Sequence, residues 1–451
     1  MICYIYGPET GLTKPMIGQG KRSQSMTPVS ISDFIRVFGR IGMLSFGGPA
    51  AQIALMHKEL VDERAWISEQ RFLSALSFCM LLPGPEAMQM ATFSGWRMRG
   101  VAGGVIAGGL FVLPGACVIT ALALIYAYFG TLPLVQSAFL GVKAAVVVIV
   151  AQALLKLSRK ALRSQFDIAI AALAFMGIYL LDIPFPTVIA AAALAGFVFT
   201  AQGGHAASVA DTPAEATVSA PQTLRTVLIW GGLWAGPLFA LYLSGHVFLT
   251  KIGLFFSTLA LVTFGGAYAV LAYMTQTVIT DFQWLTTAQM IDALGLAETT
   301  PGPLILVTQF VAMQAGFQAG SIWLALAGGG IALWMTFIPC FLWVFTFGPY
   351  FDKLSRIPKL TAALSGVTAA IVGVIFSLSL WFAVHLWFTQ TDLHSFGPVQ
   401  ILTPSIESFV PLNIVLTAVA TWALVRLKAG LELTLCGMAM LGIATGIINL
   451  I

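Results

Sequence analysis

Long apolar segments alternate with short polar ones along almost the whole chain. In the first half the apolar segments cover 33–56, 72–94, 101–128, 134–155, 165–183 and 184–200. In the second half they cover 226–245, 251–274, 289–313, 321–345, 361–385, 399–425 and 431–450. A membrane-spanning helix needs about 20 such residues, and the period-two alternation of transmembrane strands is absent. The pattern predicts an all-α polytopic membrane protein with about 13 transmembrane helices and no strands.

Polar composition divides the chain into five predicted parts. Residues 201–224 are rich in Ala, Ser, Thr, Gly and Pro, which is typical of a flexible linker. The first 30 residues carry three basic side chains with no apolar stretch after them, so we expect a cytoplasmic tail and no cleaved signal peptide. The parts are a tail (1–30), a first unit (31–200), the linker (201–224), one extra helix (225–250) and a second unit (251–451).

The two units share a sequence pattern. Three landmarks of the first unit reappear 218 residues later: Phe46-Gly47-Gly48 as Phe264-Gly265-Gly266, Trp66 as Trp284, and Pro83-Gly84-Pro85 as Pro301-Gly302-Pro303. Each Pro-Gly-Pro lies about 11 or 12 residues into an apolar segment, near the middle of a hydrocarbon core about 30 Å thick. Proline lacks an amide hydrogen and blocks helix hydrogen bonds. We therefore predict broken helices at both motifs, and paired breaks of this kind are typical of transporter binding sites.

The basic residues indicate how the two units are oriented. In the first unit, Arg97 and Arg99 follow the second apolar segment, and the basic stretch Lys156–Arg163 follows the fourth. In the second unit the matching places carry no Lys or Arg, whereas Lys353–Lys359 occupies a loop whose first-unit counterpart is bare. Because Lys and Arg favour cytoplasmic loops, the units are predicted to be inverted repeats, with the amino terminus cytoplasmic and the carboxyl end external. Chance placement of a few charges is the alternative.

Composition agrees with a membrane protein and argues against several other classes. Apolar residues make up 58% of the chain and charged residues 9%, with a mean hydropathy of +0.92, whereas soluble domains carry about 25% charged residues. The net charge of +4 is dispersed, so we expect no nucleic-acid partner. The cysteines and histidines lack ligand or disulfide spacing, so we expect no metal and no cofactor. The absence of a phosphate-binding loop and of a nucleophile–base set argues against an ATP-driven pump and an enzyme.

The predicted helix breaks suggest where a small anion binds. A helix that resumes after a break points its amino-terminal amides, the positive end of its dipole, at that break. The alternative for the proline motifs is a kink that only shapes packing, and for the glycine pairs it is close helix packing. The candidate substrate-binding residues are Gly47, Gly48, Pro83, Gly84, Pro85, Gln89, Lys143, Gly265, Gly266, Pro301, Gly302, Pro303 and Gln309.

Few charged side chains fall inside the apolar segments. Lys143 lies in the middle of 134–155, where an ammonium group is costly unless it faces protein or water. It either attracts the anion or pairs with Glu86 or Glu298. Those two glutamates flank the breaks, and a buried carboxylate can bind a proton, so both are candidates for proton coupling; a structural polar role is the alternative. Asp292 lies nearer the membrane interface and is expected to be solvated.

The same motifs resemble the chromate ion transporter family in its long-chain, two-domain form. The resemblance is carried by Phe46–Ala50, His57–Val61, Arg64–Ile67 and Leu81–Glu86 in the first unit, and by Ala297–Leu304 with Gln309-Phe310 in the second. It covers roughly 33–451, although Ala267 replaces the proline of the first-unit Phe-Gly-Gly-Pro. The resemblance implies export of chromate across the cytoplasmic (inner) membrane, driven by the proton motive force, and hence chromate resistance.

Two other transport functions stay open at this point. Sulfate has the shape and charge of chromate, so a carrier that takes up sulfate or another oxyanion is the first alternative. A passive anion channel is the second, because the same site would serve it. The expected partners are a small oxyanion, chromate or sulfate, and the lipid bilayer, and a homo-oligomer is left open.

Overall fold

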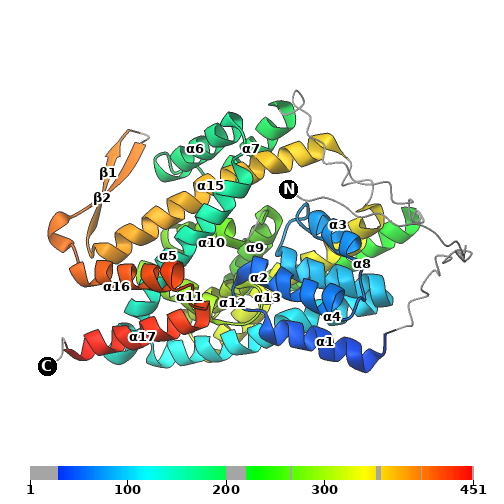
Figure 1. Ribbon diagram of the computed structural model, residues 1–451, viewed down its shortest axis with the longest axis horizontal. Helices are drawn as coiled ribbons and strands as arrows, with labels where there is room; N and C mark the ends of the chain where they lie inside the picture. The colour runs from blue at the N-terminus through cyan, green and yellow to red at the C-terminus, as the bar shows by residue number, and fades with distance from the viewer. Residues whose placement is uncertain (1–28, 200–219, 265–266, 352–356, 398, 449–451) are drawn as a thin grey trace, which may run out of the picture.

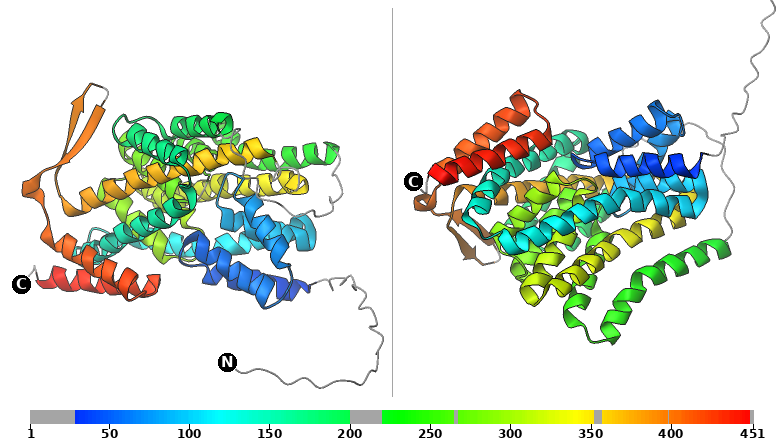
Figure 2. Two further views of the ribbon diagram at one scale, coloured as in Figure 1. Left: turned by 45° about the horizontal axis from the view of Figure 1, so that its top comes forward. Right: turned by 90° about the horizontal axis from the view of Figure 1, so that it is seen from below.

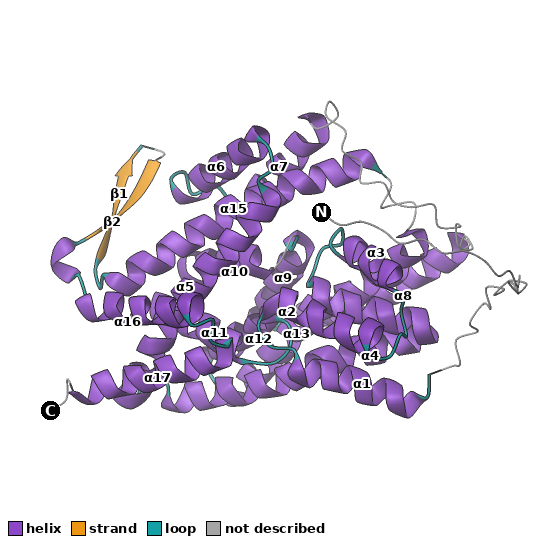
Figure 3. Ribbon diagram, in the orientation of Figure 1, coloured by secondary structure: helices purple, strands orange, loops and turns teal. Residues whose placement is uncertain are grey.

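The protein is built almost entirely from helices (Figure 3). The computed structural model describes residues 29–199, 220–264, 267–351, 357–397 and 399–448. Within those ranges, five helices are long and apolar enough to cross a membrane by length and composition. Together with the apolar composition, they make the chain an α-helical polytopic membrane protein, as predicted. The predicted tail up to residue 28, the linker up to residue 219, and Gly265 and Gly266 lie outside the described residues.

The first unit folds into helices joined by short turns. Its elements are α1 (Ile31–Leu44), α2 (Gly48–His57), the π-helical turn η1 (Lys58–Asp62), α3 (Glu69–Cys79), α4 (Glu86–Phe129), α5 (Pro133–Ala161), α6 (Gln165–Tyr179) and α7 (Phe185–Phe199). Arg99 and Gly100 leave the helical conformation inside α4, so 86–98 and 101–129 are separate helices. The extra helix α8 (Ala220–Leu243) follows and lies along the outside of the helical body (Figure 2).

The second unit repeats the order of the first. Its elements are α9 (Val247–Val262), α10 (Ala267–Gln276), η3 (Thr277–Asp281), α11 (Thr287–Thr299), η4 (Leu304–Leu306), α12 (Val307–Ala319), α13 (Ile322–Phe347), η5 (Gly348–Tyr350), α15 (Pro358–Trp387), β1 (Thr391–Phe396), β2 (Val399–Pro404), η6 (Ile406–Ser408), α16 (Pro411–Thr421), η7 (Trp422–Arg426) and α17 (Leu431–Ile448). Helices α3 and α11 start 218 residues apart, and α5 and α15 start 225 apart. The π-helical turns η1 and η3 also occupy matching places.

The pair of strands contradicts the expectation that strands are absent. Strands β1 and β2 pair antiparallel, with Thr391 opposite Pro404 and Phe396 opposite Val399. The hairpin projects away from the helical body (Figure 1). The residues of both strands are exposed or half-buried. Neither face of the hairpin is therefore buried, and the sequence lacks the alternation of apolar and polar residues that predicts a strand. The expected helix at 399–425 therefore begins only at Pro411.

The long helices α5 and α15 occupy matching places in the two units, and each packs against the last two helices of the other unit. Helix α5 contacts α16 and α17, and α15 contacts α6 and α7. Gly141 of α5 lies against the backbone of Met438, and its counterpart Gly366 of α15 lies against the backbone of Ala192. Small residues allow two helix backbones to approach this closely in a membrane. The two units are therefore interlocked.

Candidate functional site

Each Pro-Gly-Pro lies at the tip of a helical hairpin that turns back on itself. In the first unit, the ring centroids of Phe78 in α3 and Phe93 in 86–98 are 5.5 Å apart. In the second unit, the amide of Gln318 in α12 donates to Gln289 of α11 at 3.5 Å. In a chain that ran straight through either motif, both pairs would be separated by roughly 20 Å or more at 1.5 Å per residue.

The helices on either side of each Phe-Gly-Gly motif form a hairpin as well. Arg40 of α1 and Glu59, which follows α2, form an ion pair at 3.4 Å. In the second unit the rings of Phe255 in α9 and Tyr273 in α10 lie 5.9 Å apart. The segments expected to be straight spans with a break, such as 33–56, are therefore folded back. A hairpin and a straight helix have the same apolar content, so hydrophobicity alone does not separate them.

The tips of the two units are joined by a reciprocal pair of hydrogen bonds. The Gly84 amide donates to the carbonyl of Thr263 at 2.7 Å, and the Gly302 amide donates to the carbonyl of Ser45 at 2.8 Å. Both bonds obey the same 218-residue relation, so the Pro-Gly-Pro of each unit binds the first break of the other. The two glycines have φ angles of +119° and +87°, a region that residues with a side chain rarely adopt.

The tips meet halfway along a long helix. Gly115 lies at the centre of 101–129, and a Cβ atom at this glycine would come within 2.1 Å of the Pro301 carbonyl oxygen. At 1.5 Å per residue the helix extends about 21 Å on either side of this contact. The Pro301 tip therefore lies against the middle of this helix.

Four helices begin where the tips meet: α2, α4, α10 and, through the turn η4, α12. The N-cap residues described for three of them supply no side-chain cap, namely Gly47, Pro85 and Pro303. Four helices also end there, but two of their carbonyls, those of Ser45 and Thr263, are occupied by the glycine amides. The first-turn amides of a helix carry partial positive charge and lack partners within the helix. The arrangement therefore favours a small anion.

Buried glutamines support these tips. The Gln89 amide donates to the carbonyl of Pro83 at 2.7 Å, and the Gln52 amide donates to the carbonyl of Gly302 at 2.6 Å. Gln309 donates to a carbonyl and a hydroxyl of α4. The expected donors Gln89 and Gln309 thus hold the backbone in this structure. Gln52 was missed, although a polar residue inside an apolar segment was a usable signal.

The two candidate glutamates lie close to the tips. Glu298 near the end of α11 is buried, and the hydroxyl of Tyr268 donates to its Oε1 at 2.9 Å. Glu86 is the first residue of α4 and is half-buried. Tyr268 was not predicted, because it lies in α10 and its partner Glu298 lies in α11, a helix of the next hairpin.

Lys143 pairs with neither of these glutamates. Its Nζ lies 3.0 Å from Oδ1 of Asp292, and the hydroxyl of Tyr126 donates to Oδ2 of Asp292 at 2.7 Å. Asp292 is 1% exposed, so the expectation that it is solvated was wrong. The reason is that α11 is one leg of a hairpin packed against α4 and α5.

An apolar cavity of about 550 Å³ lies beside the tips. It is bounded by the hairpin tips at Pro83 and Phe264 and by side chains of α7 and α15. All of the lining residues are apolar, so the cavity itself has no side-chain donor for a dianion. The donors near it belong to the backbone at the helix starts.

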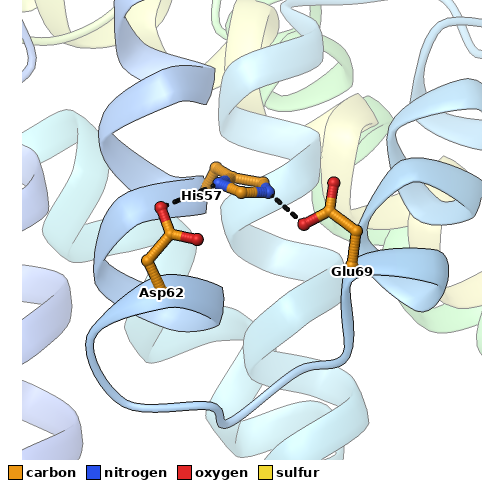
Figure 4. A group of neighbouring side chains, drawn as sticks. All are labelled: His57, Asp62 and Glu69. Carbon is orange, nitrogen blue, oxygen red and sulfur yellow. Dashed lines mark hydrogen bonds and ion pairs between the residues drawn. The ribbon is translucent and has the colours of Figure 1, made fainter. Parts of the chain in front are cut away.

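His57, at the end of α2, lies between two carboxylates (Figure 4). Its Nε2 is 2.5 Å from Glu69 and its Nδ1 is 3.3 Å from Asp62. These acids, above all the hydrogen bond to Glu69, raise the pKa of His57. The two ring nitrogens face different carboxylates, so the group is arranged to hold a protonated imidazole that ties the loop before α3 to α2. A raised pKa means that this contribution is present at low pH and is lost as the pH rises through that pKa.

A helical membrane protein with two repeated units and broken helices whose tips meet has an organisation typical of secondary transporters. Comparison with known sequences gives the family. The chain belongs to the chromate transporter family, which matches residues 32–197 and 250–446, once in each unit.

Its relatives are transport proteins. The chain is 31% identical over 361 residues to the chromate transport protein of Cupriavidus metallidurans, covering 77% of this chain and 81% of that protein. It is 32% identical over 359 residues to the chromate transport protein of Pseudomonas aeruginosa, covering 77% and 80%. It is 25% identical over 367 residues to an uncharacterized transporter of Methanocaldococcus jannaschii, covering 81% and 87%. No solved structure gives a significant match.

Proposed function

We propose that the protein exports chromate across the cytoplasmic membrane at the expense of the proton motive force, and thereby confers chromate resistance. Two relatives bear the name chromate transport protein. The observation that carries the proposal is the reciprocal hydrogen bonding of Gly84 and Gly302, which gathers four helix starts at one point. Helix starts attract a dianion through amides and dipoles, without a fixed counter-charge that would retain it.

The proposed binding site consists of the four tips. It includes the paired glycines Gly47-Gly48 and Gly265-Gly266 and the motifs Pro83-Gly84-Pro85 and Pro301-Gly302-Pro303, with Gln89 and Gln309 supporting the backbone and Lys143 as a further source of positive charge. Unwound backbone is tolerated at membrane depth only where it is buried in protein or lines a cavity. The burial of Pro301-Gly302-Pro303 and the cavity beside Pro83 meet that condition.

We propose Glu86 and Glu298 as proton-coupling residues at the tips. An ionised carboxylate repels a dianion, and protonation removes this repulsion. A negative-inside potential already favours dianion export, by about 2.3 kcal/mol per charge per 100 mV, and an entering proton adds to that drive. Glu86→Gln and Glu298→Gln are expected to keep chromate binding while weakening the dependence of flux on the pH gradient.

We further propose an inverted repeat of nine crossing helices and four re-entrant hairpins in place of straight spans. A hairpin returns to the side from which it enters; accordingly, the Arg99 side chain at the end of the second hairpin donates to the carbonyl of Val29 before α1. The crossing helices are then 101–129, α5, α6, α7, α8, α13, α15, α16 with η7, and α17. Helix α8 makes the number between the units odd, which inverts the second unit.

This topology agrees with the distribution of charge. With the start of α1 in the cytoplasm, the basic stretch Lys156–Arg163, Lys359 at the start of α15, and Arg426 and Lys428 after α16 all lie on the cytoplasmic side. That is the distribution that the positive-inside rule requires. The β-hairpin and the end of α17 are then external.

The test is a flux assay with radiolabelled chromate and sulfate in inside-out membrane vesicles that contain the protein. Export corresponds to uptake into these vesicles; we expect chromate to accumulate against its gradient, and an uncoupler to abolish the accumulation. Sulfate accumulation without chromate accumulation would replace the proposed substrate. Equilibration that is indifferent to the uncoupler would make the protein a channel.

A further inference from the structure

A buried ion pair lies between the hairpin tips and a second cavity. Lys143 and Asp292 are 3.0 Å apart, with 13% and 1% of their side chains exposed. Asp292 lies on α11, nine residues before Pro301, which corresponds to about 13 Å along the helix. A carboxylate and an ammonium group are retained at such depth only when they satisfy each other or serve a function.

The second cavity, of about 390 Å³, includes several polar side chains in its lining. Asp292 and Tyr126 form part of its wall, and the rest comes from the turn after α4 and from the starts of α5 and α11 and the end of α12. Four amide side chains contribute to the lining, namely Gln136, Gln289, Gln314 and Gln318. Amides can hold water and pass hydrogen bonds without adding charge. Both the turn after α4 and the start of α11 are external in the proposed topology.

The ion pair joins the two units, and the repeat gives it no charged counterpart. The repeat places Ser74 opposite Asp292 and Thr368 opposite Lys143. The Thr368 hydroxyl donates to the carbonyl of Leu364 in its own helix. The backbone needs no charged pair at this depth, because the repeat-related position, Ser74 of α3 with Thr368 of α15, is built without one. The pair is therefore an addition specific to the external side.

We propose that Lys143 and Asp292 form a proton-gated anion site between the hairpin tips and the external cavity. In the present structure the Asp292 carboxylate neutralises Lys143. A proton arriving through the amide-lined cavity at a carboxylate oxygen of Asp292 frees the ammonium group to bind the oxyanion. Release of that proton toward the cytoplasm restores the ion pair and displaces the anion toward the external cavity, so that a proton enters as the oxyanion leaves. The proposal rests on the proposed oxyanion transport and adds to it the residue that senses external pH.

Asp292 is the acidic group that faces Lys143 and can take up a proton beside it. From α4 the phenol of Tyr126 donates to it, and from α5 Lys143 faces it. The polar side chains that α12 brings to this cavity are amides, and the only charged residue in the sequence of α17 is Glu432 in its first turn. The other acid of α11, Glu298, is bound by Tyr268 near the tip.

The test measures chromate flux in proteoliposomes of known orientation, at fixed internal pH, while the pH on the external face is varied. We expect Asp292→Asn to bind chromate and to transport it at a rate that no longer responds to external pH, and Lys143→Met to lose flux. Asp281→Asn, which removes an exposed carboxylate of η3, is the matched control and should keep both the flux and its pH response.

A double variant, Lys143→Met with Asp292→Asn, keeps the test decisive if a single substitution prevents insertion, because it leaves no unpaired buried charge. We expect the double variant to insert and, since it lacks the ammonium group that binds the anion, to carry no chromate flux at any external pH. A normal pH response in Asp292→Asn or in the double variant overturns the gate and makes the pair structural. If even the unsubstituted protein moves no chromate, the proposed function fails, and that result is distinguishable from failure of the gate.

Discussion

At the scale of single residues, the glycine in the middle of each Pro-Gly-Pro combines two properties. Its φ angle is positive, and its amide is the only donor in the motif because both neighbours are prolines. The amides of Gly84 and Gly302 each donate a hydrogen bond to a carbonyl of the opposite unit. The prolines on each side block helix hydrogen bonds across the break. The first-turn amides of the following helix therefore have no partners in the preceding helix.

We predict that Gly84→Ala and Gly302→Ala abolish chromate flux while the protein still inserts. An alanine at a positive φ costs on the order of 1–3 kcal/mol, and a Cβ at Gly84 would lie 2.9 Å from both Cys340 Sγ and Gln89 Nε2. Gly397→Ala is the matched control, because Gly397 also has a positive φ of +64° but no atom within 4 Å of its Cβ position. Flux per inserted molecule should be normal in the control, and full flux in the Gly84 variant would contradict the role of the tips.

The sequence was sufficient to locate these glycines but not the partners of the buried charges. A doubled proline motif is visible locally, since its effect on helix hydrogen bonding depends only on its neighbours. The partner of Lys143 is 149 residues away in the sequence, and the choice among three acids is made by helix packing. Gln52 and Tyr268 were not predicted for the same reason, because each side chain contacts a hairpin other than its own.

At the scale of elements, the hairpins show the limit of hydrophobic patterning. Apolar content predicts that the segments 33–56 and 72–94 lie in the membrane, but a reversal of chain direction leaves no periodic signal in the sequence. What distinguishes a hairpin from a kinked span is a contact across the break, such as Phe78 with Phe93. The β-hairpin was missed for a different reason, because its exposed strands carry no apolar alternation.

We predict that the crossings between α5 and α17 and between α15 and α7 tolerate no added methyl group. A Cβ at Gly141 would lie 1.7 Å from the Met438 carbonyl oxygen, and one at Gly366 would lie 2.4 Å from that of Ala192. Gly141→Ala and Gly366→Ala should each cost about 1–3 kcal/mol through overpacking and lower the thermal unfolding temperature in detergent. Gly330→Ala in α13, where no atom lies within 4 Å, should leave it unchanged or raise it; equal behaviour of all three would refute the close crossing.

At the scale of the whole molecule, different parts of the chain lie at the two ends of the long helices. The β-hairpin and the end of α17 lie at one end of the long helices, and the starts of α1, α8 and α15 lie at the other (Figures 1 and 2). From the basic residues alone, the sequence predicts a cytoplasmic amino terminus and linker and an external carboxyl end. The proposed topology keeps that prediction, because replacing two straight spans by two hairpins does not change the side to which the chain returns.

The two arrangements differ at the loops that join the hairpins, and that difference gives the final prediction. With straight spans, a residue between η1 and α3 lies on the external side, opposite the linker; with re-entrant hairpins it lies in the cytoplasm, on the linker's side. We expect a single cysteine at Ser68, in a background without the native cysteines, to be protected from a membrane-impermeant thiol reagent in intact cells, as is a cysteine at Thr212. A cysteine at Gln283, the matching loop of the second unit, should be labelled, together with a tag at the carboxyl end. Labelling at position 68 in intact cells, with protection at 212, would support straight spans. It would contradict the re-entrant hairpins and the meeting of the four helix starts.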